Sequence, residues 1–411
     1  MLNFPFKFNS MAKITYLLGA GASANTIPVV ANFHRRMIEL KKYLESCLPL
    51  APLIIKKPFD IGEKHLSTLE NIIKDFDWLI TQAGNYFTID TLAKKFYLTD
   101  ETDNLTKLKK CLVTYFTLEQ YVFVNSEPYG QYKFEKFEID KRYDSFIAAI
   151  AKKNRNNTGS ASLSDDWTKI VLNNEIKILS WNYDIQFERS LQRFINKKIH
   201  FIQSKFQIYP NKNSLNESED IVINQEEFSM VKLNGNAIWD EFVDQPPLKN
   251  IPTIYDRNND VKENKILLEF YLDKYKYAFF NPHSQRENEP IEYFNFAWEN
   301  DKRFREKYSG HDKNLETAEL IASETQILVV IGYSFPIFNR EIDNRLFNKM
   351  ENLRKIYIQD IKPDRIKSTM LNAFNFKNIN EQVNPEYEYS PQIFLEKNTN
   401  QFVIPYELNQ E

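Results

Sequence analysis

Two hydrophobic patterns alternate along the chain. Short runs of consecutive apolar residues predict buried strands, and stretches with an apolar residue every three or four positions predict helices. The predicted strands are residues 14–18, 176–180, 230–233, 327–331 and 355–360. The predicted helices are residues 33–48, 66–83, 105–124, 138–152, 187–194 and 315–323. This alternation predicts an α/β fold, Rossmann-like, with a mainly parallel sheet.

The predicted strands are unevenly spaced, and roughly 150 residues separate the first from the second, too many for a structureless loop. Helical aromatic periodicity between Phe59 and Phe146 supplies a core for that stretch. We therefore expect a single domain over residues 1–411, with a helical insertion at about 41–165 and a second insertion at about 240–315.

Net charge and hydrophobic content exclude some classes of protein for this chain. The chain has 411 residues, 42% of them hydrophobic, which is ample for a large core. Its 53 basic and 56 acidic residues give a net charge of -3, which argues against an autonomous basic nucleic-acid binder. No stretch approaches the ~20 apolar residues of a membrane span. Neither nucleic acid nor a membrane is an expected partner.

The cysteines indicate a reducing compartment. Cys47 and Cys111 are the only two, so a four-cysteine zinc module is excluded and no metal site is expected. Cys111 falls on the apolar side of a helical pattern, which favours a buried structural thiol over a nucleophile.

One segment permits another interpretation. Residues 14–21 follow Lys7 and Lys13 and precede Ala22-Ser23-Ala24, as in a secretory signal with its cleavage site. The residues before it are aromatic-rich rather than a basic leader, and Met11 could be the natural start. We expect a folded cytoplasmic chain.

Glycine is scarce, with 9 residues, and several lie at the ends of predicted strands. The first motif, Gly19-Ala20-Gly21-Ala22-Ser23-Ala24, follows a strand and approximates the phosphate-binding G-x-G-x-x-A, in which glycines admit a pyrophosphate to backbone amides and a helix N-terminus. A tight turn is the alternative.

A Rossmann dehydrogenase also needs an acidic residue at the end of the next strand. Glu39 has the right spacing but lies in a helical pattern, which weakens the dehydrogenase interpretation.

Polar side chains follow the next two strands. Asn182 in Trp181-Asn182-Tyr183-Asp184 can donate its amide to a ribose hydroxyl or hold a water. Asp184 could fix the loop or cap the helix that follows. The third motif, 231–236, again places a glycine after a strand, with Asn234 before it.

The last two strands end in groups suited to a nucleotide. Gly332 and Ser334, in the segment Ile331-Gly332-Tyr333-Ser334-Phe335-Pro336, suit phosphate or ribose contact at the carboxyl edge of the sheet. Asp360 ends the fifth strand and could reach a second ribose.

The ordered set GAGAS…IP, WNYD, KL-x-G and IGYSFP resembles the sirtuin-type NAD-binding domain. It resembles the sirtuin-like NADases of bacterial antiphage defence more closely than the protein deacetylases, and the motifs span Gly19 to Asp360. The resemblance implies NAD binding by Gly19, Ala20, Gly21, Ala22, Ser23, Pro28, Asn182, Asp184, Gly332, Tyr333, Ser334 and Asp360. Asn182 would be the catalytic asparagine.

Two departures from the family matter. The zinc module of the deacetylases is missing, which argues against protein deacetylation. The family's catalytic histidine is replaced by Asn234, and an amide cannot take a proton as imidazole does. The five histidines, at 34, 65, 200, 283 and 311, include none at the matching position. Natural divergence and an introduced substitution both remain open as the origin of Asn234.

The resemblance implies an NAD+ glycohydrolase that releases nicotinamide and ADP-ribose and depletes NAD during phage infection, with low activity here because of Asn234. It also implies a homo-oligomer with a HerA-type ATPase partner, and the aromatic insertion is either an assembly surface or simple core. The alternative is a non-catalytic module that binds NAD or ADP-ribose.

Overall fold

The computed structural model describes residues 12–27, 30–46, 48, 62–121, 125–126, 132–133, 139–153, 170–211, 223–237, 295–300, 309–374 and 391–409. Its centre is a seven-stranded sheet in which every paired neighbour is parallel, in the order β11-β10-β9-β1-β6-β8-β7. The strands are β1 (Ile14–Leu18), β6 (Ile176–Ser180), β7 (Ile208–Tyr209), β8 (Ser229–Lys232), β9 (Ile327–Ile331), β10 (Lys355–Gln359) and β11 (Gln392–Glu396). All five predicted strands are present, and each end lies within one residue of its predicted position.

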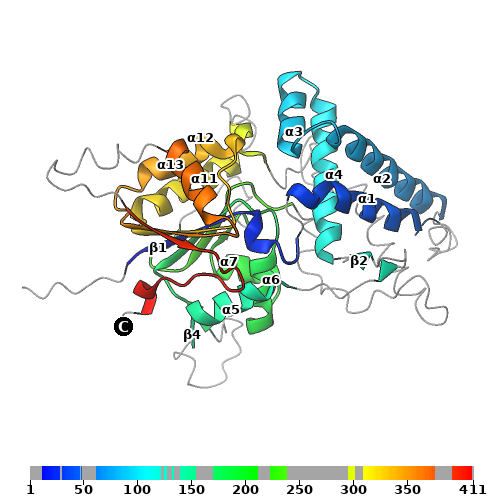
Figure 1. Cartoon of the computed structure of the whole chain (residues 1–411). Helices are drawn as coiled ribbons and strands as arrows, with labels where there is room; N and C mark the ends of the chain where they lie inside the picture. Colours follow the sequence, from blue (N-terminus) through cyan, green and yellow to red (C-terminus); the bar gives the residue numbers. More distant parts are fainter. Residues whose placement is uncertain are drawn as a thin grey trace, which may run out of the picture.

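Helices cover both faces of this sheet (Figure 1). One face carries α11 (Ser309–Glu324), α12 (Arg340–Lys349) and α13 (Pro363–Ala373). The other carries α5 (Lys141–Ile150), α6 (Gln186–Ile195) and α7 (Ile199–Lys205). Side chains alternate between the faces, as a strand requires: Leu17 packs with the first group, and Tyr16 and Leu18 with the second.

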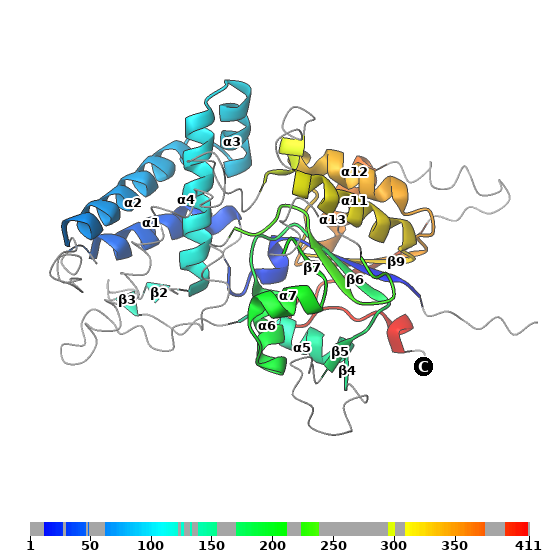
Figure 2. The ribbon, with the colours of Figure 1, turned by 180° about the vertical axis from the view of Figure 1, so that it is seen from behind.

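Four further helices lie beyond the carboxyl ends of the strands (Figures 1 and 2). They are α1 (Val30–Ser46), α2 (Gly62–Ala83), α3 (Ile89–Leu98) and α4 (Thr102–Tyr121). Together they bury their own apolar cluster, to which Ile185 and Ala237 from the strand-end loops also belong. We call these four helices the helical layer. It rests on the edge of the sheet where α/β proteins bind ligands.

The helical layer overlaps the predicted insertion, with different limits. Its first helix begins at Val30, ahead of residue 41, whereas α5 lies inside 41–165 yet packs on the sheet through Tyr143 and Phe146. The second insertion, about 240–315, falls mainly outside the described residues, which include from it only η4 (Ala297–Asn300), its flanking residues and the start of α11. Two short hairpins, β2–β3 (Asn125–Ser126, Tyr132–Lys133) and β4–β5 (Ala151–Lys153, Ile170–Leu172), complete the strands.

The predicted α/β fold with a parallel sheet and helical insertions is confirmed. Cys111 is also the buried structural thiol expected: it is free, fully buried in the helical layer, and burial raises the pKa of its thiol. Cys47 lies outside the described residues. Glu39 lies in α1, paired with Arg36, so it is not the acid that a dehydrogenase carries after its second strand.

Candidate functional site

The strand register brings the sequence motifs to one edge. Leu18, at the end of β1, is level with Ser180 of β6 and with Ile331 of β9, and Ser180 is level with Lys232 of β8. The strands that follow β1 in the chain lie on both sides of it in the sheet: β6 and β8 on one side, and β9 and β10 on the other. The segments after these strands therefore meet at a switch point of the sheet, the usual ligand-binding position.

The Gly19–Ser23 segment is a tight turn packed against the end of β9. Residues Ala20–Ser23 form a short 3-10 helix, η1, and the next α-helix begins only at Val30. A Cβ on Gly21 would lie 2.6 Å from Gly332 Cα, and a Cβ on Gly332 would lie 2.4 Å from Gly21 Cα. Only glycine permits this approach, and Gly332 also has a φ of +59°.

This packing explains the glycines without a ligand. The amides of Gly19 and Gly21 donate to the carbonyls of Ile331 and Gly332 (both 3.0 Å), and that of Ala22 donates to Gly19 (2.8 Å). No α-helix N-terminus follows directly, contrary to the motif. The amides of Gly19, Gly21 and Ala22 are used within the protein, and the contacts of these residues with NAD stay predictions. Ala20 is exposed, while Pro28 is outside the described residues.

Asn182 lies close to this turn. Its Nδ2 donates to Ser23 Oγ at 3.4 Å, and Ser23 Oγ is 3.1 Å from the hydroxyl of Tyr143 on α5. Asn182 is only 7% exposed, and its backbone amide donates to Ser180 Oγ (3.1 Å). Two predicted site residues separated by 159 positions in sequence are therefore in contact.

Asp184 fixes the loop after Asn182. Its carboxylate accepts the amide of Gln186, the first residue of α6, at 3.0 Å. The N-cap of α6 is Ile185, so Asp184 fixes the loop and does not cap the helix. Burial raises the pKa of this carboxyl, although Lys232, the Gln186 amide and Ser23 oppose the rise.

Asn234 follows β8 and is 5% exposed. Its side-chain Nδ2 donates to the hydroxyl of Tyr183 (3.3 Å), and its backbone carbonyl accepts a hydrogen bond from the backbone amide of Asn295 (3.1 Å). Among the described residues its Oδ1 has no hydrogen-bond partner. Burial raises the pKa of Tyr183 well above its ordinary value, so the phenol stays protonated. This pair can hold a polar ligand but offers no group that exchanges a proton near neutral pH.

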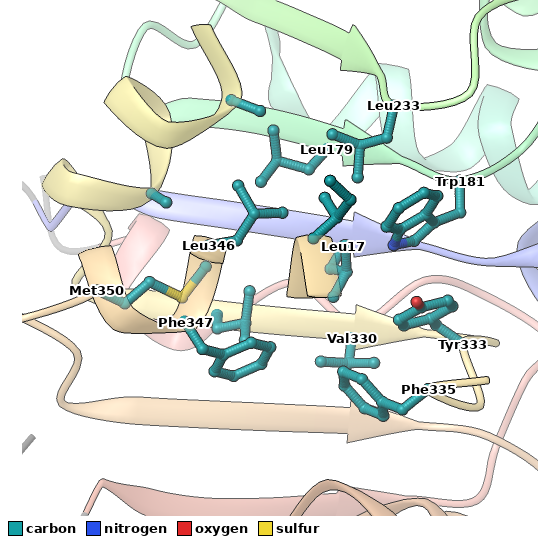
Figure 3. Packing of buried hydrophobic residues seen from close by; sticks show 14 of the residues in the cluster. Leu17, Leu179, Trp181, Leu233, Val330, Tyr333, Phe335, Leu346, Phe347 and Met350 are labelled. Atoms are coloured by element: carbon teal, nitrogen blue, oxygen red, sulfur yellow. The ribbon is translucent and has the colours of Figure 1, made fainter. Parts of the chain in front are cut away.

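Tyr333 faces the core rather than an adenosine. Its ring stacks on Trp181 at 6.0 Å between centroids (Figure 3), and its hydroxyl donates to Asp343 Oδ2 at 2.6 Å. Trp181 Nε1 donates to the other oxygen of Asp343 (3.2 Å). The predicted ligand contact is therefore left to the backbone at Gly332 and Tyr333 and to the exposed Ser334.

Asp360 lies at the same edge, but after β10, which β9 separates from β1. Its carboxylate accepts the amide of Lys362 at 2.8 Å in the turn that leads to α13. It remains half-buried, and its contact with a ribose stays a prediction.

Three contributors to the edge are not among the predicted site residues. Arg142 of α5 donates from Nη2 to the carbonyls of Gly21 (3.2 Å) and Ala22 (3.1 Å), and its pair with Asp140 (2.6 Å) is buried. Tyr143 contacts Ser23, and Lys232 lies buried beneath the loops after β6 and β8. Lys232 is the lysine of the KL-x-G motif, a signal that could have found it. Arg142 and Tyr143 are distant in sequence from every motif.

The helical layer reaches the same loops. Gln120 Oε1 of α4 accepts the amide of Ile185 at 2.9 Å, and the rings of Phe116 and Tyr183 are 5.4 Å apart. Lys109, also on α4, donates to Asn295 Oδ1 (3.1 Å) and pairs with Glu299 (2.8 Å). We call the loops after β6 and β8, which carry Asn182 and Asn234, the asparagine loops. Because the amide of Asn295 is hydrogen-bonded to Asn234, α4 is linked to both of them.

Within the described residues, no group of three or more His, Cys, Asp and Glu side chains could hold a metal ion. No described helix is long and apolar enough to cross a membrane.

No protein-family model and no curated protein matches this chain.

Proposed function

We propose that the chain binds NAD at the carboxyl edge of its sheet and is an NAD+ glycohydrolase of the sirtuin-like type, with low activity as it stands. The contact of Asn182 with Ser23 carries the proposal, because it unites the two motifs to which the resemblance assigns nicotinamide-ribose and pyrophosphate. Asn234, in the loop after the neighbouring strand β8, supplies the third group at this edge.

In the proposed reaction, the bond between the ribose C1′ and the nicotinamide nitrogen breaks and its electron pair neutralises the pyridinium. Water adds to C1′ and loses a proton, giving nicotinamide, ADP-ribose and one proton. Asn182 would orient the ribose or the attacking water through its amide. Asn234 cannot accept the released proton, and losing a general base typically costs ~10²–10⁴ in rate.

The biological setting is proposed from the resemblance. It comprises NAD depletion in antiphage defence, a cytoplasmic homo-oligomer, and a HerA-type ATPase partner, without zinc, nucleic acid or membrane contact. The contacts of α4 with both asparagine loops give such a partner a route to the site through the helical layer.

A non-catalytic NAD or ADP-ribose binding module is the second candidate. The Asn234–Tyr183 pair favours it, because two neutral, buried groups recognise a polar ligand without accepting a proton.

The first experiment measures nicotinamide and ADP-ribose released from NAD by the purified chain and by Asn234→His. We expect the histidine to raise the rate about 10²–10⁴-fold. The gain should grow with pH through about 6–7, because neutral imidazole is the base. Asn352→His, at an exposed asparagine before β10, is the matched control and should leave the rate unchanged.

A second substitution, Asn182→Ala in the Asn234→His chain, should abolish the gain. A rate of nicotinamide release that is the same in all of these variants would contradict the assignment of this edge as the site. If neither form releases nicotinamide but both bind NAD in calorimetry, the binding module is the correct function. A chain that binds neither NAD nor ADP-ribose overturns the proposal.

A further inference from the structure

A buried ion pair lies directly beneath the two asparagine loops. Lys232 ends β8, Glu188 lies in the first turn of α6, and both residues are 0% exposed. Lys232 Nζ is 2.5 Å from Glu188 Oε1. Desolvating two charges is costly, so such a pair needs an explanation beyond its mutual attraction.

The ammonium donates to both loops as well as to Glu188. It donates to the carbonyl of Asp184 (2.6 Å), two residues after Asn182, and to Oδ1 of Asn236 (2.7 Å), two residues after Asn234. These contacts use its three donors. Lys232 therefore connects the segments that follow the two asparagines, each at the same offset.

Stability alone does not account for the pair. Glu188 Oε2 is buried and has no hydrogen-bond partner in the described part of the chain, and Oε1 accepts only one further, long bond, from Gln203 (3.4 Å). An apolar pair of similar volume is often as stable as a buried ion pair or more so. What an apolar pair cannot supply is a fixed donor to two loops.

We propose that Lys232 is a positioning residue that sets the separation of Asn182 and Asn234 around a nicotinamide ribose, with Glu188 as its compensating charge. The ligand in this inference rests on the proposed function, whereas the connection between the loops does not. Lys232 touches no ligand itself; it acts through the backbone of Asp184 and the side chain of Asn236.

The test compares Lys232→Met with Lys232→Met/Glu188→Leu in the full chain. The single variant should lose stability, because it leaves a buried unpaired carboxylate, and the double variant should recover it. Hydrogen exchange should nevertheless be faster at residues 182–184 and 233–237 of the double variant. Its Kd for NAD should rise about tenfold, because binding must then order two loops that are no longer held in place beforehand.

The matched control is Lys355→Met/Glu407→Leu, which removes an ion pair at the opposite end of the strands. It should change neither the exchange of the two loops nor the Kd. Asn236→Ala, which removes one acceptor and keeps the ion pair, should loosen 233–237 and weaken NAD binding, and decides the question if the double variant does not fold.

A stable double variant with wild-type exchange and wild-type Kd overturns the inference. A wild-type chain that does not bind NAD overturns the proposed function, and the exchange comparison then still decides whether Lys232 positions the loops.

Discussion

The Asp343 carboxylate shows how one buried residue ties the site to the core. It lies on α12 and accepts hydrogen bonds from Trp181 after β6 and from Tyr333 after β9. Both donors are neutral, so burial dominates and raises the pKa of Asp343 to about 7. The residue that holds two strand ends together is therefore sensitive to pH near neutrality.

This pKa predicts a slope in stability. An unfolded aspartate ionises near pH 4, whereas folded Asp343 keeps its proton to about pH 7. Unfolding therefore releases a proton in this window, and the free energy of unfolding falls as pH rises from about 4 to about 7, by up to ~1.4 kcal/mol per pH unit. Asp343→Asn should flatten that slope in urea titrations at pH 5, 6 and 7.

Asp364→Asn, at an exposed position in α13, is the control and should leave the slope as in the wild type. Part of the slope persists in Asp343→Asn, because burial also raises the pKa of Glu119 to about 7. Parallel pH profiles for Asp343→Asn and the wild type would contradict the assignment.

At the scale of elements, α5 supports the turn between β1 and the helical layer. Arg142, near the start of α5, donates hydrogen bonds to the carbonyls of Gly21 and Ala22. The charge of its guanidinium is compensated by the carboxylate of Asp140. This support comes from a helix that packs on one face of the sheet, so the turn is held by an element distant in sequence.

Replacing this arginine tests the support. Arg142→Met leaves Asp140 buried without its cation, so we expect a loss of about 3–5 kcal/mol in unfolding free energy and weaker NAD binding. Arg345→Met is the control, because its pair with Glu319 is partly exposed and should cost no more than about 1 kcal/mol. Denaturant titration and calorimetry measure both effects; equal losses in the two variants would refute the buried role.

At the scale of the whole molecule, the helical layer and the sheet meet at the site. Gln120 of α4 accepts the amide of Ile185, and both residues are buried. A change in the position of α4 therefore alters the loop that carries Asn182. This contact makes the helical layer part of the site's framework as well as a separate cluster.

Gln120→Met should expose that dependence. The Ile185 amide loses its acceptor, which should cost about 1–3 kcal/mol. Exchange at Ile185 should accelerate while the centre of the sheet stays protected. Gln82→Met, in the last turn of α2, is the matched control and should leave Ile185 unchanged. Identical exchange at Ile185 in both variants would show that the helical layer does not hold the loop.

The strands, and the edge at which they end, could be predicted from local sequence alone. Apolar runs such as residues 14–18 and 327–331 must be buried on both faces, and this local property predicts a parallel sheet whose strand-end residues gather together. The short helices α3, α7, α12 and α13 were not predicted. The helices α7, α12 and α13 present only a few apolar positions, whereas α3 carries Ile89, Leu92, Ala93 and Phe96 at helical spacing, a signal that could have found it.

Which side chains face the site and which face the core depends on how the chain packs in three dimensions. Sequence patterns report local periodicity, whereas burial and hydrogen bonding depend on contacts across hundreds of positions. Tyr333 belongs to a predicted motif yet turns into the core toward Asp343, and Arg142 belongs to no motif yet supports the turn. Likewise Gly21 and Gly332 are required by each other, because two backbones meet there and leave no room for a Cβ.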